Sequence, residues 1–298
     1  MISHTIGVYG LSESELRSRL DALDIPVDVI DRDGEWQLVL TTETEEQATD
    51  SICKLRESLN VYVYGVDIPD LQSRVVQLLT ARGFTLATAE SCTGGMLSEL
   101  LTTVPGASAV FECGVAAYSA AIKHELIGVS ADTIYQYGTI APQTAAEMAA
   151  GVRRVGHATL GIGITGAAGP SASEGHPAGT VFVAMADEKR VWGKSIRVDG
   201  AALGRDKVRR LAVLQALDLA RRYLEAWPTV MAGGTPILPP EEETSLPPSA
   251  PIKKRSWKER LLPTVKNGRA ANFRLLAMWV FAVLGLAAVI WLSVLYLL

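Results

Sequence analysis

Two side chains that could act as nucleophiles, Ser91 and Cys92, lie in the segment Thr-Ala-Glu-Ser-Cys-Thr-Gly-Gly at residues 88–95. The apolar run before this segment predicts a short buried strand, and residues 96–101 after it predict the first turns of a helix. A serine or cysteine between a strand and a helix is well placed for attack on a carbonyl group. Cys92 is a rival to Ser91, because a thiolate at a helix N-terminus is activated, but it could equally be a small buried core residue.

The predicted turn also offers backbone groups to a ligand. Thr93 is a candidate N-cap, because its hydroxyl can accept a hydrogen bond from the first turn of the helix. Gly94 and Gly95 allow the backbone to approach a ligand closely. A strand-to-helix turn directs several unpaired N–H groups toward one point, which suits an anion or a developing oxyanion. We therefore expect the chemistry of the protein at this turn.

A serine hydroxyl needs a base before it becomes an effective nucleophile. His124 and His176 are the histidines that a serine–histidine triad would use, and neither has an informative position in the sequence. Lys123 is the other candidate, since it follows a long uncharged stretch and burial there would lower its pKa. Tyr118, five residues before the lysine, could relay a proton or hold the amine. The residues alone leave histidine and lysine open as the base.

A second group of residues could hold a phosphate. A glycine-rich loop over residues 165–169 follows an apolar strand predicted at 158–164, and backbone N–H groups in such a loop can surround a phosphate. Arg205, at the start of the last predicted helix of this region, could add a fixed positive charge. The candidate ligand-binding residues are Thr165, Gly166, Gly169 and Arg205, together with Thr93, Gly94 and Gly95 of the turn.

Composition excludes several classes of protein. The 298 residues carry a net charge of −4, which argues against a general polyanion binder. The three cysteines show no CxxC spacing and predict neither a disulfide framework nor a zinc site, and no other metal site is expected. The first residues have neither the basic nor the apolar region of a signal peptide.

The pattern of apolar residues divides the chain into two α/β domains. Residues 1–67 predict a small β-α-β-β-α-β unit with 5 basic and 14 acidic side chains, which argues against nucleic-acid binding. Residues 68–227 alternate strands and helices, which predicts a layered α/β/α domain with ligand loops at the strand ends. A capping box at Ser12–Glu15 and a two-residue hairpin turn at Asp33-Gly34 are expected in the small unit.

The remaining residues have three different compositions. Residues 228–252 are rich in proline and predict an extended linker, and residues 253–274 carry eight basic side chains against one acidic side chain. Residues 275–298 contain no charged side chain and are long enough to cross a bilayer as a helix. We therefore expect a single-pass C-terminal transmembrane anchor in the cell membrane, with the basic segment at anionic lipid and the catalytic domain in the cytoplasm.

Several motifs follow one another in the order that is typical of a known family. They are residues 88–95, Gly114–Ser119 with Lys123, Gly138–Pro142, Ile164–Pro170, Pro177–Val181 and Gly204–Arg209. Together they resemble the C-terminal amidohydrolase domain of the CinA (competence/damage-inducible) family, the nicotinamide-nucleotide amidohydrolases. Residues 1–67 are similar to the small domain that precedes this domain in full-length members, whose large molybdopterin-binding-like domain has no counterpart in the sequence.

The resemblance implies deamidation of nicotinamide mononucleotide (NMN) to nicotinate mononucleotide and ammonia, without a metal or organic cofactor. It assigns Ser91 as nucleophile, Lys123 as general base and Tyr118 as the third member. N–H groups near residues 93–95 would hold the oxyanion, and the loop at 165–169 with Arg205 would hold the nucleotide. We expect NMN as the small-molecule partner and a homo-oligomer.

The sequence departs from the family pattern around the expected substrate pocket. Ser171-Ala172-Ser173 stands where the family usually has Asp-Gly-Gly, His176 stands at a position that is often basic, and Gly204 replaces an aspartate before Arg205. These changes leave a second hypothesis open. In that hypothesis the protein is catalytically degenerate and acts at the membrane as a nucleotide-binding scaffold or signalling protein.

Overall fold

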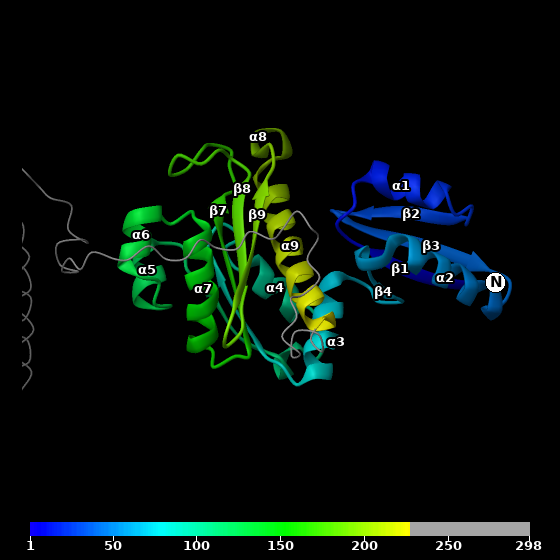
Figure 1. Cartoon of the computed structure of the whole chain (residues 1–298), viewed down its shortest axis with the longest axis horizontal. Helices are drawn as coiled ribbons and strands as arrows, with labels where there is room; N and C mark the ends of the chain where they lie inside the picture. Colours follow the sequence, from blue (N-terminus) through cyan, green and yellow to red (C-terminus); the bar gives the residue numbers. More distant parts are fainter. Residues whose placement is uncertain (227–298) are drawn as a thin grey trace, which may run out of the picture. The chain divides into compact units, whose positions relative to one another are not determined.

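The structure is a computed structural model that describes residues 1–226, which form two β-sheets with helices packed against them (Figure 1). The first sheet contains four strands in the order β2-β3-β1-β4, and each neighbouring pair is antiparallel. Its elements appear in the predicted β-α-β-β-α-β order. They are β1 (Ile2–Val8), α1 (Glu13–Asp21), β2 (Val27–Arg32), β3 (Glu35–Thr42), α2 (Glu45–Leu59), the 3-10 turn η1 (Asn60–Tyr62) and β4 (Val63–Val66).

Local sequence signals account for the ends of these elements. The backbone N–H of Glu15 donates to the Ser12 hydroxyl, and the N–H of Ser12 donates to the Glu15 carboxylate at 2.9 Å, so the predicted capping box is confirmed. Asp33 and Gly34 have φ values of +54° and +99° and form the hairpin turn between β2 and β3. The capping box and the hairpin turn could be predicted because each depends on residues that are close together in the sequence.

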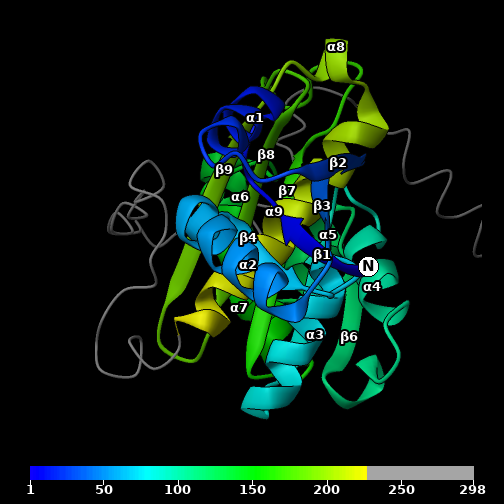
Figure 2. The ribbon, with the colours of Figure 1, turned by 90° about the vertical axis from the view of Figure 1, so that its right-hand side faces the viewer.

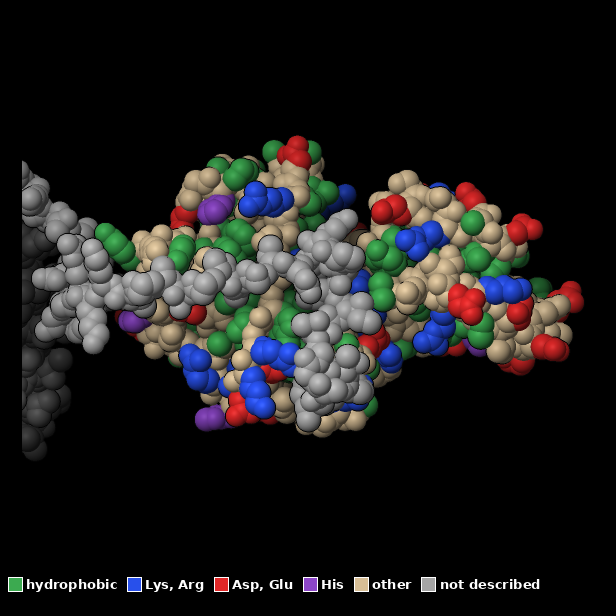
Figure 3. All heavy atoms as spheres, viewed as in Figure 1, with side chains coloured by type: hydrophobic (Ala, Val, Ile, Leu, Met, Phe, Trp, Pro, Cys, Tyr) green, Lys and Arg blue, Asp and Glu red, His purple; other side chains and the backbone are tan. Residues whose placement is uncertain are grey.

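The small sheet has two different faces. Leu38 and Leu40 of β3 are buried with Ile6 of β1 under α1 and α2, where they form an apolar core. The alternate side chains of β3 point the other way, and two of them, Glu35 and Gln37, are buried polar residues. Acidic side chains outnumber basic ones on the visible surface of this unit (Figure 3), as its composition predicts.

The second sheet contains five strands in the order β6-β5-β7-β8-β9. Strand β5 is parallel to both β6 and β7, whereas β8 and β9 continue the sheet in antiparallel pairing. The elements are α3 (Leu71–Arg82), β5 (Leu86–Glu90), α4 (Met96–Thr102), the 3-10 turn η2 (Ala107–Ala109), β6 (Phe111–Ala116), α5 (Ala120–Glu125), α6 (Ala131–Tyr137), α7 (Pro142–Val155), β7 (Leu160–Ala167), β8 (Thr180–Ala186), β9 (Val191–Arg197), α8 (Gly200–Leu203) and α9 (Arg205–Glu225).

Helices cover both faces of this larger sheet (Figures 1 and 2). Helix α7 packs on one face, and α3, α4 and α9 pack on the other, which is the predicted layered arrangement. The residues of strand β7 alternate between the two faces of the sheet. Ile162 and Ile164 face α9, whereas Gly161 and Gly163 face α7, where an added Cβ would meet the helix backbone.

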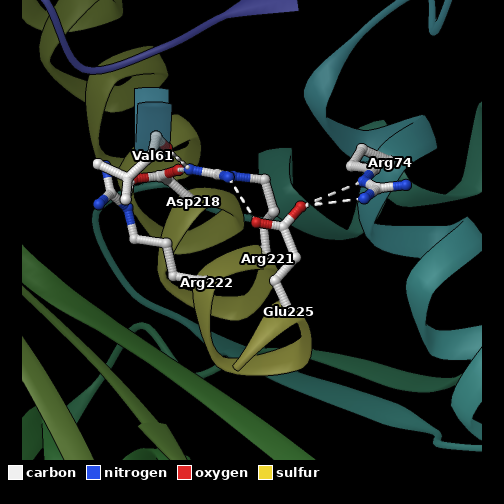
Figure 4. Close-up of polar contacts among 6 residues, drawn as sticks. All are labelled: Val61, Arg74, Asp218, Arg221, Arg222 and Glu225. Atoms are coloured by element: carbon white, nitrogen blue, oxygen red, sulfur yellow. Dashed lines mark hydrogen bonds and ion pairs between the residues drawn. The ribbon is translucent and has the colours of Figure 1, made fainter. Parts of the chain in front are cut away.

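The last helix also carries a buried network of charges (Figure 4). Asp218 is 3% exposed and accepts hydrogen bonds from Arg221 Nη2 at 2.6 Å and from Arg222 Nε at 2.7 Å. Arg221 also donates to the Val61 carbonyl of the small unit at 2.7 Å and to Glu225. The network therefore joins α9 to the turn before β4, and it satisfies charges that would be costly to bury alone.

The sequence-based fold class needs a correction. Among the helices of residues 1–226, none combines the length and the apolar character that crossing a membrane requires, and the longest one, α9, is rich in charged side chains. The predicted span at 275–298 lies outside the described residues, as do the predicted linker and basic segment. The fold class is therefore corrected to a mixed α/β fold with two sheets. The predicted transmembrane helix, membrane contact and cell-membrane localisation have no support in it.

The buried network leads to a prediction about stability. Asp218→Asn removes the one carboxylate that both Arg221 and Arg222 share, so we expect the free energy of unfolding to fall by about 3–5 kcal/mol. Denaturant unfolding of the full chain measures this change. Asp50→Asn is the matched control, because its ion pair with Lys54 is exposed and should contribute little. Equal effects of the two substitutions would contradict the assigned role of Asp218.

Candidate active site

Three neighbouring strand ends bring the candidate residues together. Glu90, the last residue of β5, is paired in register with Ala116 of β6 and with Ile164 of β7. The residues that follow these three positions therefore leave the same edge of the sheet side by side. Ser91 follows β5, Tyr118 and the helix that carries Lys123 follow β6, and Thr165 lies near the end of β7.

Ser91 and Lys123 meet at this edge. The amino nitrogen of Lys123 lies 3.0 Å from the Ser91 hydroxyl oxygen, and it also donates to the carbonyl oxygens of Ala117 at 2.7 Å and Tyr118 at 3.3 Å. The Lys123 side chain has no exposed surface. Burial lowers its pKa from 10.5 to about 8, against a smaller opposing effect of Glu174 and Cys92. A substantial fraction of this amine is therefore neutral near pH 8 and can accept a proton from Ser91.

The turn that carries Ser91 is held by Glu90, a residue that the sequence reasoning missed. Its buried carboxylate accepts hydrogen bonds from the backbone N–H groups of Gly95, Leu97 and Ser98 at 2.9–3.1 Å, and from the Ser98 hydroxyl. Glu90 therefore satisfies the free donors at the start of α4. A glutamate at the end of an otherwise apolar buried strand was the available signal.

The prediction that Thr93 caps α4 is wrong. Gly95, with a φ of +102°, is the N-cap residue, and the buried Thr93 hydroxyl has no hydrogen-bond partner within the described chain. The N–H of Gly94 donates to the Ser91 carbonyl and that of Gly95 to Glu90, so both donors already have partners. The Thr93 N–H is the donor in residues 93–95 that has no partner among residues 1–226. The carboxylate took the capping role because its longer side chain reaches three donors.

The fold does not favour the rival nucleophile Cys92 or the rival bases His124 and His176. Burial raises the pKa of the Cys92 thiol to about 11, so the thiol is protonated at neutral pH. His124 hydrogen-bonds to the Val129 carbonyl, and His176 packs edge-on against Phe182. Lys123 is therefore the candidate base that the fold brings within hydrogen-bond distance of the serine.

Tyr118 meets Lys123 through its backbone rather than its hydroxyl. Its carbonyl oxygen accepts a hydrogen bond from the lysine, whereas its side chain is 65% exposed. Within the described residues, its hydroxyl makes no hydrogen bond to Ser91 or Lys123. The role of third catalytic residue thus stays a prediction.

The residues predicted to bind phosphate divide into two groups. Thr165 donates to the Thr139 carbonyl at 2.6 Å, and Gly166 lies within β7, where a side chain would meet β8. Thr165 therefore joins β7 to the segment at Thr139, and Gly166 allows β8 to lie close to β7. Gly169, with a φ of +95°, begins the loop after β7, and its carbonyl accepts a hydrogen bond from Arg205 at 2.7 Å. Arg205 therefore lies at the base of this loop.

Arg209, one turn after Arg205 on α9, is a second residue that the sequence reasoning missed. It donates to the Thr93 carbonyl at 2.8 Å and so directly contacts the turn that carries Ser91. Arg205, Arg209 and Lys123 are the positive charges that act on Cys92. Arg209 therefore places a positive charge at this turn, which favours an anionic group on a ligand.

The loop between β7 and β8 contributes a carboxylate to the same region. Glu174 accepts hydrogen bonds from the N–H of Thr139 at 2.7 Å, from the Thr139 hydroxyl at 2.6 Å and from the N–H of Ile140 at 3.3 Å. It is the carboxylate whose charge acts on Lys123. No three metal-ligating side chains gather in the part of the chain that the structure describes.

Known proteins resemble this chain in sequence and in structure. A putative competence-damage inducible protein of Caldanaerobacter subterraneus is 40% identical over 233 residues, and a CinA-like protein of Desulfovibrio desulfuricans is 40% identical over 214 residues. These alignments cover 75% and 70% of the chain, but only 56% and 50% of the relatives. The chain therefore spans about half the length of the curated relatives that it matches.

Solved structures of CinA superfamily proteins also resemble this chain. A competence-damaged protein (CinA) superfamily protein of Klebsiella pneumoniae is 33% identical with a TM-score of 0.50, and the match covers 53% of this chain and 97% of that one. A protein of the same superfamily from Enterobacter cloacae is 31% identical, also with a TM-score of 0.50, over 53% of this chain and 92% of that one.

The family model matches the part of the chain that contains the site. Residues 69–224 match the model of the CinA C-terminal domain, and this segment begins just before α3 and ends within α9. It includes the serine, the lysine and the loops around them. Because the match covers more than half of the 298 residues, this protein belongs to the CinA family.

Proposed function

We propose that this protein is an amidohydrolase that converts NMN to nicotinate mononucleotide and ammonia, with Ser91 as nucleophile and Lys123 as general base. Family membership supports the proposal, since the CinA C-terminal domain is the one that the resemblance associates with this activity. The observation that carries it is the buried amine of Lys123 at 3.0 Å from the Ser91 hydroxyl. A buried lysine with its pKa lowered to about 8 can serve as a base, which an exposed lysine cannot at neutral pH.

In the first step, neutral Lys123 takes the hydroxyl proton of Ser91 as the serine oxygen bonds to the carboxamide carbon. The carbonyl oxygen becomes an oxyanion, for which the free N–H of Thr93 is a donor. When the carbon–nitrogen bond breaks, the Lys123 ammonium gives its proton to the leaving amine, which departs as ammonia. A nicotinoyl ester remains on Ser91.

In the second step, a water molecule gives one proton to Lys123 while its oxygen bonds to the ester carbon. The bond to the serine oxygen then breaks, and Lys123 returns the proton to Ser91. The acid product ionises to nicotinate mononucleotide. The carbonyls of Ala117 and Tyr118 keep the amine in place during both transfers.

Arg205 and Arg209 are the proposed phosphate-binding side chains. Both belong to the first turns of α9, and Arg209 already contacts the turn that carries Ser91 through the Thr93 carbonyl. In this proposal the exposed ring of Tyr118 approaches the substrate, and its hydroxyl acts as the third catalytic group.

The role of the serine–lysine pair predicts a large loss of activity. Ser91→Ala and Lys123→Met should each lower kcat/KM for ammonia release from NMN at least about 100-fold, because general-base and nucleophilic catalysis are lost. Coupled measurement of ammonia release with the full-length protein tests this. Ser195→Ala and Lys189→Met, both exposed near β9, should keep full activity.

The same assay decides between catalysis and binding alone. Ammonia release that persists in Ser91→Ala would rule out the serine as nucleophile. If the unsubstituted protein binds NMN but releases no ammonia, a nucleotide-binding scaffold describes it better.

The lowered pKa of Lys123 predicts how activity depends on pH. Only the neutral amine can accept the serine proton, so kcat/KM should rise about tenfold per pH unit below pH 8 and level off above it. Initial rates measured from pH 6.5 to 9.5 give this profile. A profile that is flat through pH 8 would be incompatible with Lys123 as the base.

Glu90 is proposed as a positioning residue for Ser91. Glu90→Gln places an amide NH₂ group near backbone donors that the carboxylate now accepts, so we expect a lower melting temperature and a lower kcat. The pH at which activity is half-maximal should stay the same, because Lys123 is untouched. Glu99→Gln, exposed on α4, is the matched control. Unchanged kcat in Glu90→Gln would show that the turn does not need the carboxylate.

A further inference from the structure

A cavity of about 400 Å³ lies where the small sheet meets the start of α3 and the first half of α9. Its walls include Glu35 of β3, Tyr64 of β4, Gln72 of α3 and Arg210 of α9. The candidate active site around Ser91 uses none of these four residues. A volume of this size falls within the range of cavities that bind small molecules.

Hydrogen bonds between the small unit and the larger domain define the walls of this cavity. The Glu35 carboxylate accepts the backbone N–H of Leu71 at 2.8 Å and a hydrogen bond from Arg210 Nη2 at 3.2 Å. The side-chain nitrogen of Gln37 donates to the Pro69 carbonyl at 2.7 Å. The cavity is therefore built by residues of both domains, and it is not a gap between surface loops.

Two buried side chains among the lining residues carry polar atoms that are not satisfied. The side-chain oxygen of Gln72 and the hydroxyl of Tyr64 have no hydrogen-bond partner within residues 1–226. Gln72 is 6% exposed and Tyr64 is 1% exposed. A buried polar atom without a partner costs free energy, so a molecule in the cavity that donates hydrogen bonds to these oxygens would bind favourably.

The lining charges of the cavity are mainly negative. Four carboxylates and two guanidinium groups surround it. They belong to Asp31, Asp33, Glu35, Asp70, Arg32 and Arg210. The excess of carboxylates favours a ligand with a positive charge.

Glu35 is the buried member of this group, since it is 3% exposed. Burial raises its pKa, and the Leu71 N–H and the positive charge of Arg210 only partly oppose this effect. The present partners of Glu35 therefore do not fully compensate for the loss of water around its carboxylate. A further cation beside it would do so.

We propose that this cavity is a binding site for a small organic cation that carries N–H donors, such as an amine, an amidine or a guanidine. The N–H groups of the ligand would donate to the Gln72 oxygen and to the Glu35 carboxylate. Its carbon skeleton would contact Ile30 and Pro69, which add apolar surface to the wall. The site does not depend on the proposed amidohydrolase activity.

Binding of defined probes to the full-length protein tests this site. The probes are agmatine, putrescine and benzamidine, which are cations with N–H donors, and tetraethylammonium, which is a cation without them. Calorimetry should detect binding of at least one of the first three, and tetraethylammonium should bind at least about tenfold more weakly, because it donates no hydrogen bond. Ser91→Ala should leave the affinity unchanged. Absence of binding by all three donors, or equal binding of tetraethylammonium, would overturn the proposal.

Gln72→Leu separates a contact with the ligand from a role in folding. It replaces a buried amide whose oxygen has no partner by an apolar side chain of similar size. Probe affinity should fall at least about tenfold, while the melting temperature stays the same or rises. Gln77→Leu, exposed on α3, is the matched control and should bind the probe normally. A melting temperature that falls with the Gln72→Leu substitution would contradict the proposal, because the amide would then serve the fold.

Glu35→Gln tests the contribution of the buried charge. It keeps an oxygen for the Leu71 N–H but removes the negative charge, so probe affinity should fall at least about tenfold. Asp50→Asn removes an exposed carboxylate from the same small unit and should keep the affinity. Equal losses in the two variants would mean that the probes follow the overall negative charge of the small unit, and a specific site in the cavity would be ruled out.

Discussion

The position of β5 between two parallel partners decides where every group of the site lies. Parallel pairing with β6 and β7 brings three strand ends to one edge of the sheet, so Ser91, the helix that carries Lys123 and the start of the β7–β8 loop become neighbours. In an antiparallel arrangement the next strand would end at the opposite edge. The glycines of β7 support this arrangement, because they allow α7 to pack directly against the sheet. The proximity of Ser91 and Lys123 is thus a consequence of strand order.

Burial gives Lys123 properties that an exposed lysine lacks. Desolvation disfavours the ammonium form, and neutral carbonyl oxygens rather than a hydrogen-bonded carboxylate accept its donors, so the pKa falls. Burial also makes Cys92 a poorer nucleophile, because it disfavours the thiolate. Burial therefore favours the neutral form of Lys123 and, at the same time, disfavours the reactive thiolate form of Cys92.

Two carboxylates that were not singled out in the sequence organise the loops around this pair. Glu90 closes the turn that carries Ser91, and Glu174 joins the β7–β8 loop to Thr139. Each accepts several backbone N–H bonds, which fixes a loop more firmly than a single capping bond. The motif around Glu174 departs from the family pattern, and in this chain Glu174 accepts hydrogen bonds from Thr139 and Ile140.

Signals between chain neighbours were sufficient to predict the small β-α-β-β-α-β unit, the Ser12–Glu15 capping box, the Asp33-Gly34 turn and the location of Ser91 in a strand-to-helix turn. The motifs identified the family, because their residue types and order are specific. Contacts between distant residues decided the rest: Lys123 rather than a histidine beside Ser91, Glu90 rather than Thr93 at the start of α4, and Arg209 at the turn. Burial and long-range electrostatics set these outcomes, and both depend on which strands and helices pack together.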